Sequence, residues 1–137
     1  MEIMLNMDKI SVKAIIVWKN NVLLLKPRNL KGSIGGWDIP GGHAKTRETL
    51  TQALVREVYE ETGIKIQKAY PIKILKLSNT SVEYVIFLCK TISNKVVLSD
   101  EHTDYRWVRI ENVDKTVKRL LFKDLLEIKN LISKLLI

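Results

Sequence analysis

The amino-acid sequence predicts an α/β or α+β sandwich in which helices pack over a mixed β-sheet. Strand-like apolar runs come before and after one amphipathic helix, and the leucine spacing becomes helical from Val113 onward. The chain has 137 residues, 46% of them hydrophobic, which is enough for one compact domain with a sizeable core. We therefore expect residues 1–137 to form a single domain.

The N-terminal part is predicted to form a β-hairpin followed by a loop. Residues 11–18 (SVKAIIVW) and 22–26 (VLLLK) are β-branched or leucine-rich runs joined by a short Lys-Asn-Asn turn. Residues 27–36 contain proline and several turn-forming residues, which indicates a loop. Residues 37–42 (WDIPGG) are then predicted to be a short extended piece closed by a glycine turn.

The clearest predicted helix runs from Thr49 to Thr62 and is ended by Gly63, at the usual C-terminal capping position. Its apolar residues recur every four positions, at Leu50, Leu54 and Val58. A stripe with this spacing must face the core, so the helix is expected to pack against the sheet.

The second half of the chain is predicted to supply more strands and then helices. Residues 70–77 (YPIKILKL) and 82–92 (VEYVIFLCKTI) are strand-like, and the second run is apolar on both faces, which suggests a central strand. Residues 95–100 (KVVLSD) and 105–110 (YRWVRI) are shorter candidate strands. Terminal helices are predicted from the leucines that follow, at positions 120, 121, 125, 126, 131 and 135.

Composition and charge narrow the class of protein. The formal net charge of +8 favours polyanionic ligands such as nucleotides, RNA or anionic membrane, although a lysine-rich solubilising surface gives the same charge. The single cysteine, Cys89, excludes a disulfide framework within the chain. No apolar run approaches the roughly 20 residues that span a bilayer, and the first residues do not resemble a signal peptide. We expect a soluble cytoplasmic protein.

Three glutamates, Glu57, Glu60 and Glu61, crowd the second half of the predicted helix, where like charges three or four residues apart repel. On a helical wheel, Glu57 and Glu61 lie beside the apolar stripe and Glu60 lies further round. A solvated helix face is the ordinary explanation of such a run. However, a carboxylate at the margin of the core must be paired or bind a metal. Because Arg56 can pair with only part of the cluster, the remaining charge indicates a cation.

Ligands that are all oxygen select a hard ion, Mg²⁺ first and Mn²⁺ second. Mg²⁺ held by a few carboxylates keeps coordination positions for water and substrate phosphates, and it can assist hydroxide attack on phosphorus. The basic surface fits this chemistry, because lysines and arginines attract a polyphosphate. The residues therefore favour metal-assisted cleavage of a phosphoanhydride.

Residues 42–64 (GHAKTRETLTQALVREVYEETGI) resemble the Nudix box: glycine, five residues, glutamate, seven residues, then Arg-Glu-aliphatic-x-Glu-Glu-x-Gly-aliphatic. The flanking sequences GGWDIPGG and YRWV also resemble this family, so the similarity extends from the first hairpin to Trp107. Such a pattern is far more specific than a lone glycine motif. Its defining positions are filled by Gly42, Glu48, Arg56, Glu57, Val58, Glu60, Glu61, Gly63 and Ile64.

The resemblance implies an α/β/α sandwich with the box helix packed against a mixed sheet. It also implies hydrolysis of a nucleoside diphosphate linked to another group. By position, it makes Glu57, Glu60 and Glu61 metal ligands, together with the carbonyl oxygen of Gly41.

Further roles follow from the same resemblance. Arg56 would orient a glutamate, and Glu48 would support the site. Many members of the family add an acidic residue from a later loop, here Glu101 or, as second choice, Asp104. The general base differs among Nudix enzymes, so Glu57 and Glu101 both remain candidates.

The chain departs from many relatives just before the first glutamate of the box. Lys45 and Arg47 occupy positions that often hold an acidic residue and a glycine. Neither position belongs to the defining pattern, so we expect catalysis to be retained. Arg47 would nevertheless cost free energy if the turn needs a positive φ.

Several residues outside the box are candidates for substrate binding. Trp37 could stack on a base, although a core position is the alternative. Lys26 and Arg28, at the end of the second strand, could contact phosphate or could simply be solvated. His102 lies beside the presumed metal-site loop, where a histidine is more often a hydrogen-bonded loop residue.

The sequence and the resemblance together predict a Mg²⁺-dependent pyrophosphohydrolase that converts a nucleoside or deoxynucleoside triphosphate to the monophosphate and pyrophosphate. A non-catalytic nucleotide- or RNA-binding module of the same fold is the alternative. With 7% aromatic residues, the chain has few side chains for stacking on RNA, so a small nucleotide is favoured over nucleic acid. The leucine- and lysine-rich C-terminal segment is expected to pack on the sheet or in a homodimer contact rather than on a membrane.

Overall fold

The predicted N-terminal hairpin is present in the computed structural model of the chain. The structure describes residues 10–28, 36–76, 81–113 and 130. Strands β1 (Ile10–Trp18) and β2 (Asn21–Pro27) pair antiparallel. The turn between them holds Lys19 and Asn20 at φ 44° and 64°, the left-handed conformation typical of tight hairpin connections.

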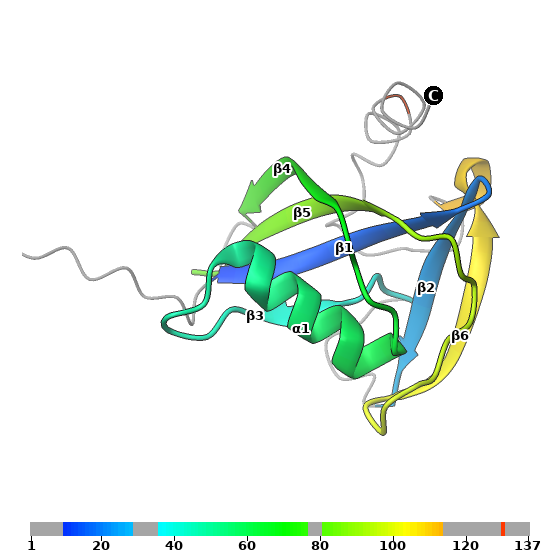
Figure 1. Ribbon diagram of the computed structural model, residues 1–137, viewed down its shortest axis with the longest axis horizontal. Coiled ribbons are helices and arrows are strands. Elements are labelled where there is room, and N and C mark those ends of the chain that lie inside the picture. The colour runs from blue at the N-terminus through cyan, green and yellow to red at the C-terminus, as the bar shows by residue number, and fades with distance from the viewer. Residues whose placement is uncertain (1–9, 29–35, 77–80, 114–129, 131–137) are drawn as a thin grey trace, which may run out of the picture.

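The described strands form one mixed sheet in the order β4-β5-β1-β2-β6, with β3 paired to β1 (Figure 1). The further strands are β3 (Gly41–His43), β4 (Ala69–Lys76), β5 (Glu83–Lys90) and β6 (His102–Arg109). Strands β1 and β5 run parallel, whereas β1–β2, β1–β3, β2–β6 and β4–β5 are antiparallel. The prediction of a central strand in residues 82–92 is confirmed, because β5 lies between β4 and β1.

Both faces of the sheet are buried around its central strands. In β1, all residues from 11 to 17 are buried, and the apolar side chains among them belong to two clusters. The helix-side core contains Val12, Ala14 and Ile16 of β1 together with Leu54 and Val58 of the helix. The opposite core contains Ile15 and Val17 of β1 with other buried residues of β2, β5 and β6. The buried Cys89 belongs to the helix-side core, and burial raises the pKa of its thiol to about 12.

Helix α1 (Leu50–Thr62) lies across one face of the sheet (Figure 1), as its apolar stripe predicts. It begins at a capping box: the Thr49 hydroxyl accepts from the Gln52 amide, and the Gln52 side chain accepts from the Thr49 amide. Such a cap stabilises a helix by about 1 kcal/mol. The helix ends at Gly63, whose φ of 73° is left-handed and whose amide donates to the carbonyl of Tyr59. The predicted helix and both of its ends are thus confirmed.

Two local predictions are wrong. Residues 95–100 do not form a strand. The Val97 amide donates to the carbonyl of Thr62 at the end of α1, so this backbone hydrogen bond is made with the helix and not with a neighbouring strand. Val96 and Leu98 still pack against the helix-side core, which accounts for the apolar pattern. The glycines of residues 37–42 do not close a turn either, because Gly41 and Gly42 begin β3 and pair with β1.

Residues 105–110 are correctly predicted as a strand, although β6 begins earlier, at His102. A short 3₁₀ helix, η2 (Ile110–Asn112), follows β6. The helices predicted from Val113 onward lie outside the described residues, apart from position 130. The architecture shown by the described residues is a mixed α/β fold with α1 on one face of the sheet.

Candidate active site

Arg56 is the centre of an ion-pair network on α1. Its Nε and Nη2 atoms donate to the two carboxylate oxygens of Glu48, at 2.6 and 2.9 Å, and Nη1 donates to Glu57 at 2.9 Å. Glu60 is 3.4 Å from Nη1, and its side chain is 55% exposed. The hydrogen bond from Arg56 holds the pKa of Glu48 at about 2, and the same pair raises the pKa of Arg56. Arg56 therefore holds the Glu48 and Glu57 carboxylates in place by hydrogen bonds.

The turn before Glu48 is strained in the way expected from the sequence. Arg47 has φ 77°, in the left-handed region that favours glycine. The turn is closed by Lys45, whose amide donates to Glu48 at 2.8 Å. The Glu48 carboxylate thus accepts hydrogen bonds from both the loop and Arg56. These bonds stabilise the turn before α1 and offset the strain at Arg47.

The Glu57 carboxylate lies directly over the backbone of Gly42 in β3. A Cβ atom added to Gly42 would be 2.5 Å from Cδ of Glu57 and 2.6 Å from one of its oxygens. Real Cβ contacts essentially never come so close. A side chain at this position would therefore displace the Glu57 carboxylate from the edge of β3.

Glu61 is the buried member of the glutamate cluster, with 3% of its surface exposed. Its Oε1 accepts a hydrogen bond of 3.0 Å from the amide of Gly41. Burial raises the pKa of Glu61 to about 8, and the charges of Glu57 and Glu101 act in the same direction. The Gly41 amide and the ammonium of Lys13 oppose this rise.

Glu61 also lies close to Glu101, at the end of the loop that precedes β6, and to His102, the first residue of β6. One ligand atom each from Glu61, Glu101 and His102 lie within 4.8 Å of one another. Nε2 of His102 is 3.6 Å from Oε2 of Glu61, and its Nδ1 is buried without a hydrogen-bond partner among the described residues. Burial is the main cause that lowers the pKa of His102. Nε2 of His102 and the two carboxylates are donors of the kind that a divalent ion needs.

The structure thus brings three of the predicted acidic site residues to one edge of β3. Glu57 and Glu61 reach it from α1, and Glu101 reaches it from the β6 loop. Asp104, the second choice for the loop acid, lies further along β6, where it is exposed and accepts from the amide of Tyr105. The metal-binding roles of Gly41, Glu57, Glu60 and Glu61 remain predictions.

Sequence reasoning missed a buried ion pair beside this edge. Nζ of Lys13, in β1, is 3.2 Å from Oδ2 of Asp38, and both side chains are about nine-tenths buried. Lys13 Nζ also lies 3.5 Å from the carbonyl oxygen of Ile39, and the other oxygen of Asp38 accepts from the Ile39 amide. A lysine inside the apolar run of residues 11–18 was the available signal, because a charge in a buried strand requires a partner.

Two of the three residues predicted to bind substrate, Trp37 and Arg28, have side-chain partners within the protein. Trp37 is half-buried against the core opposite the helix, and the guanidinium of Arg106 lies 4.7 Å from the centre of its ring. Arg28 donates from Nε to the carbonyl of Asp100 at 2.7 Å, and its amide donates to the carbonyl of Glu101. Lys26 is half-buried opposite Asp104 in the β2–β6 pair. Arg28 therefore anchors the loop that carries Glu101, and the phosphate and base contacts remain predictions.

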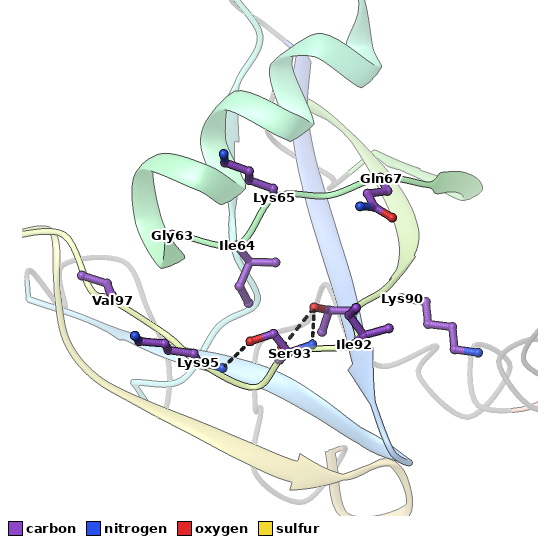
Figure 2. A pocket seen from close by; sticks show the side chains of 10 residues that line it. Gly63, Ile64, Lys65, Gln67, Lys90, Ile92, Ser93, Lys95 and Val97 are labelled. Carbon is purple, nitrogen blue, oxygen red and sulfur yellow. Dashed lines mark hydrogen bonds between the residues drawn. The ribbon is translucent and has the colours of Figure 1, made fainter.

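A pocket of about 420 Å³ lies at the C-terminal end of α1, between Gly63 and the segment after β5 (Figure 2). Its lining contains none of the predicted site glutamates. Figure 2 shows the side chains of Lys65 and Lys90 pointing away from each other, so they do not converge on a shared anion. The chemistry of the carboxylate edge is therefore separate from this pocket.

The buried Glu61 carboxyl leads to a stability prediction for the metal-free protein. The folded-state pKa of Glu61, about 8, exceeds the ordinary value of 4.5. The contribution of the protonated carboxyl to the free energy of unfolding is therefore fully present below pH 4.5 and is lost as the pH rises through 8. We expect Glu61→Gln to raise stability at pH 8 in EDTA by on the order of 2 kcal/mol. Urea unfolding at pH 5 and pH 8 measures this.

The gain in the free energy of unfolding caused by Glu61→Gln should be smaller at pH 5 than at pH 8. The effect of the exposed Glu83→Gln on this free energy should be the same at both pH values. Equal destabilisation by Glu61→Gln at both pH values would contradict the burial of a costly charge.

The comparisons with known proteins agree with the geometry. Residues 7–127 match the NUDIX domain. The chain is 30% identical over 102 residues to an 8-oxo-dGTP diphosphatase of Buchnera aphidicola, covering 74% of this chain and 78% of the relative. It is 26% identical over 129 residues to an ADP-ribose pyrophosphatase of Methanocaldococcus jannaschii, covering 88% and 75%. Among solved structures, a MutT protein of Methanosarcina mazei superimposes with a TM-score of 0.70 at 30% identity, covering 91% and 94%.

The described residues contain no helix that is both long and apolar enough to cross a membrane.

Proposed function

The chain belongs to the Nudix hydrolase family, and on this premise we propose that it is a Mg²⁺-dependent pyrophosphohydrolase of nucleoside or deoxynucleoside triphosphates. Its products would be the nucleoside monophosphate and pyrophosphate. The observation that carries the proposal is the convergence of Glu57, Glu61 and Glu101 at the β3 edge, where Gly41 and Gly42 bring the backbone close to the carboxylates.

The carboxylates fit a hard divalent ion, with Glu57, Glu60 and Glu61 and the carbonyl oxygen of Gly41 as its proposed ligands. When bound, the ion would neutralise phosphate charge and activate water for attack on phosphorus. The pKa of Glu61 near 8 is consistent with such a site, because a cation would stabilise the carboxylate that burial disfavours.

The side chains of the protein would accept the proton of the attacking water and hold the accepting carboxylate in place. In the reaction, a bond forms between the water oxygen and phosphorus, and a P–O bond of the bridge between the α- and β-phosphorus breaks, whichever of the two phosphorus atoms is attacked. The water proton passes to a carboxylate, for which Glu57 and Glu101 are the two candidates. Arg56 holds Glu57 by a 2.9 Å hydrogen bond, and Arg28 donates to the carbonyl oxygens of both Asp100 and Glu101.

The substrate class is supported by the relatives and by charge. The relative of Buchnera aphidicola is named for a deoxynucleoside triphosphate, and the one of Methanocaldococcus jannaschii is named for ADP-ribose. The net charge of +8 favours the more highly charged triphosphate. The higher identity to the first relative favours the same choice.

The proposal is tested by a screen for phosphate and pyrophosphate release in the presence of Mg²⁺. The panel contains common and oxidised nucleoside triphosphates, dinucleoside polyphosphates, ADP-ribose and nucleotide sugars. We expect the highest kcat/KM with one group of triphosphates. A clear preference for ADP-ribose or a dinucleoside polyphosphate would overturn the substrate class. No turnover by folded protein that still binds Mg²⁺ and nucleotide would favour a non-catalytic binding module.

A further inference from the structure

Glu61, Glu101 and His102 form a donor set that differs from the set of box glutamates. It shares Glu61 with that set but takes its other two members from the start of β6 and the residue before it, and one of them supplies nitrogen. Its three ligand atoms lie within 4.8 Å of one another. From this grouping we propose that the three residues bind a first-row transition ion such as Zn²⁺ or Co²⁺, with the His102 imidazole as a ligand.

The distance between His102 and Glu61 suits two ligands of one ion. Their separation of 3.6 Å, from Nε2 to Oε2, is longer than the 2.7–3.2 Å typical of an N–H···O hydrogen bond. Two ligands that are each about 2.0–2.1 Å from a tetrahedral ion lie about 3.3 Å apart. A small adjustment of either side chain would therefore place both atoms in one coordination sphere.

The second nitrogen of the imidazole gives an independent observation. Nδ1 of His102 is buried and has no hydrogen-bond partner within the part of the chain that the structure describes. The side chain as a whole is 11% exposed. Buried polar atoms are nearly always satisfied, so the imidazole lacks a partner that is not among the described residues. An ion on one nitrogen and a water on the other would complete it.

The chemistry of the donors determines which ion is preferred. Carboxylate and carbonyl oxygens suit Mg²⁺, whereas imidazole suits the later first-row ions. Three protein ligands with one open position are also the usual composition of a catalytic zinc site. His102 would thus strengthen the binding of Zn²⁺ or Co²⁺ without a comparable effect on Mg²⁺.

The test uses the full chain without nucleotide, so it is independent of hydrolysis. Calorimetric titrations at pH 7 give the Kd of Zn²⁺ and of Mg²⁺ for wild type, His102→Gln and His43→Gln. The sequence contains two histidines, so His43 is the matched control; it is exposed, and its Nδ1 is 2.9 Å from the Ser11 hydroxyl. We expect His102→Gln to weaken Zn²⁺ binding about tenfold or more while the Kd of Mg²⁺ stays nearly constant. His43→Gln should change neither.

A second measurement uses only the wild-type protein, so its result does not depend on whether the His102→Gln variant folds. In wild-type protein labelled with ¹⁵N, added Zn²⁺ should shift the imidazole nitrogens of His102 and leave those of His43 in place. Unchanged His102 nitrogens, or a Zn²⁺ affinity that is equal in wild type and His102→Gln, would overturn the proposal. Either result would leave the proposed hydrolysis untouched, because that activity is measured separately with Mg²⁺ and nucleotide.

Discussion

Replacing Glu57 with glutamine is expected to lower the turnover of a nucleoside triphosphate by about 10²- to 10⁴-fold, the range associated with a positioned proton acceptor. The variant keeps the shape of the side chain and one acceptor oxygen, so the hydrogen bond from Arg56 and the contact over Gly42 can persist. What disappears is the negative charge that the proposed metal site and the proton transfer both need. Initial rates of pyrophosphate release at saturating Mg²⁺ measure the effect.

The matched control for this change is Glu83→Gln, which removes the same charge from an exposed position at the start of β5. It should leave turnover nearly unchanged. Both variants should unfold at nearly the wild-type Tm, because Arg56 still holds Glu48 through two hydrogen bonds. Near-normal turnover in folded Glu57→Gln would end the assignment of Glu57 as ligand or base.

Replacing Lys13 with methionine is expected to destabilise the protein by about 3–5 kcal/mol, the usual effect of breaking a buried ion pair. The change removes an ammonium that lies 3.2 Å from the buried Asp38 carboxylate. Asp38 also pairs with Leu25 through two backbone hydrogen bonds, so the damage should reach the segment that leads into β3. Urea unfolding at pH 7 gives the free energy.

The double variant Lys13→Met/Asp38→Asn separates the charge from the packing. Asparagine can still accept the hydrogen bond that Asp38 takes from the Ile39 amide at 2.8 Å. Because the buried negative charge is gone, we expect the double variant to be more stable than Lys13→Met alone. A double variant that loses the sum of the two single effects would show that the pair is not coupled.

The elements predicted with success are those whose signals are local. The four-residue apolar spacing and Gly63 indicate α1 without help from the rest of the chain. The hairpin is defined in the same way by two apolar runs and a short turn. In both cases, local sequence preference and burial in the core favour the same structure.

The predictions that failed, or could not be made, depend on contacts between distant segments. Residues 95–100 have the composition of a strand, but Val97 finds its backbone partner at the end of α1. The pairing of Lys13 with Asp38 joins β1 to the segment before β3, and spacing along the chain does not indicate it. The meeting of His102 with Glu61 likewise depends on how the β6 loop folds back against the helix.

The central claim is that the carboxylate edge of β3 directs metal-dependent cleavage that releases pyrophosphate. The most direct measurement is ³¹P NMR of the products from a nucleoside triphosphate, in Mg²⁺ and after addition of excess EDTA. The account predicts a nucleoside monophosphate and pyrophosphate in Mg²⁺ and no reaction in EDTA. A nucleoside diphosphate with inorganic phosphate, or undiminished cleavage in EDTA, would contradict it.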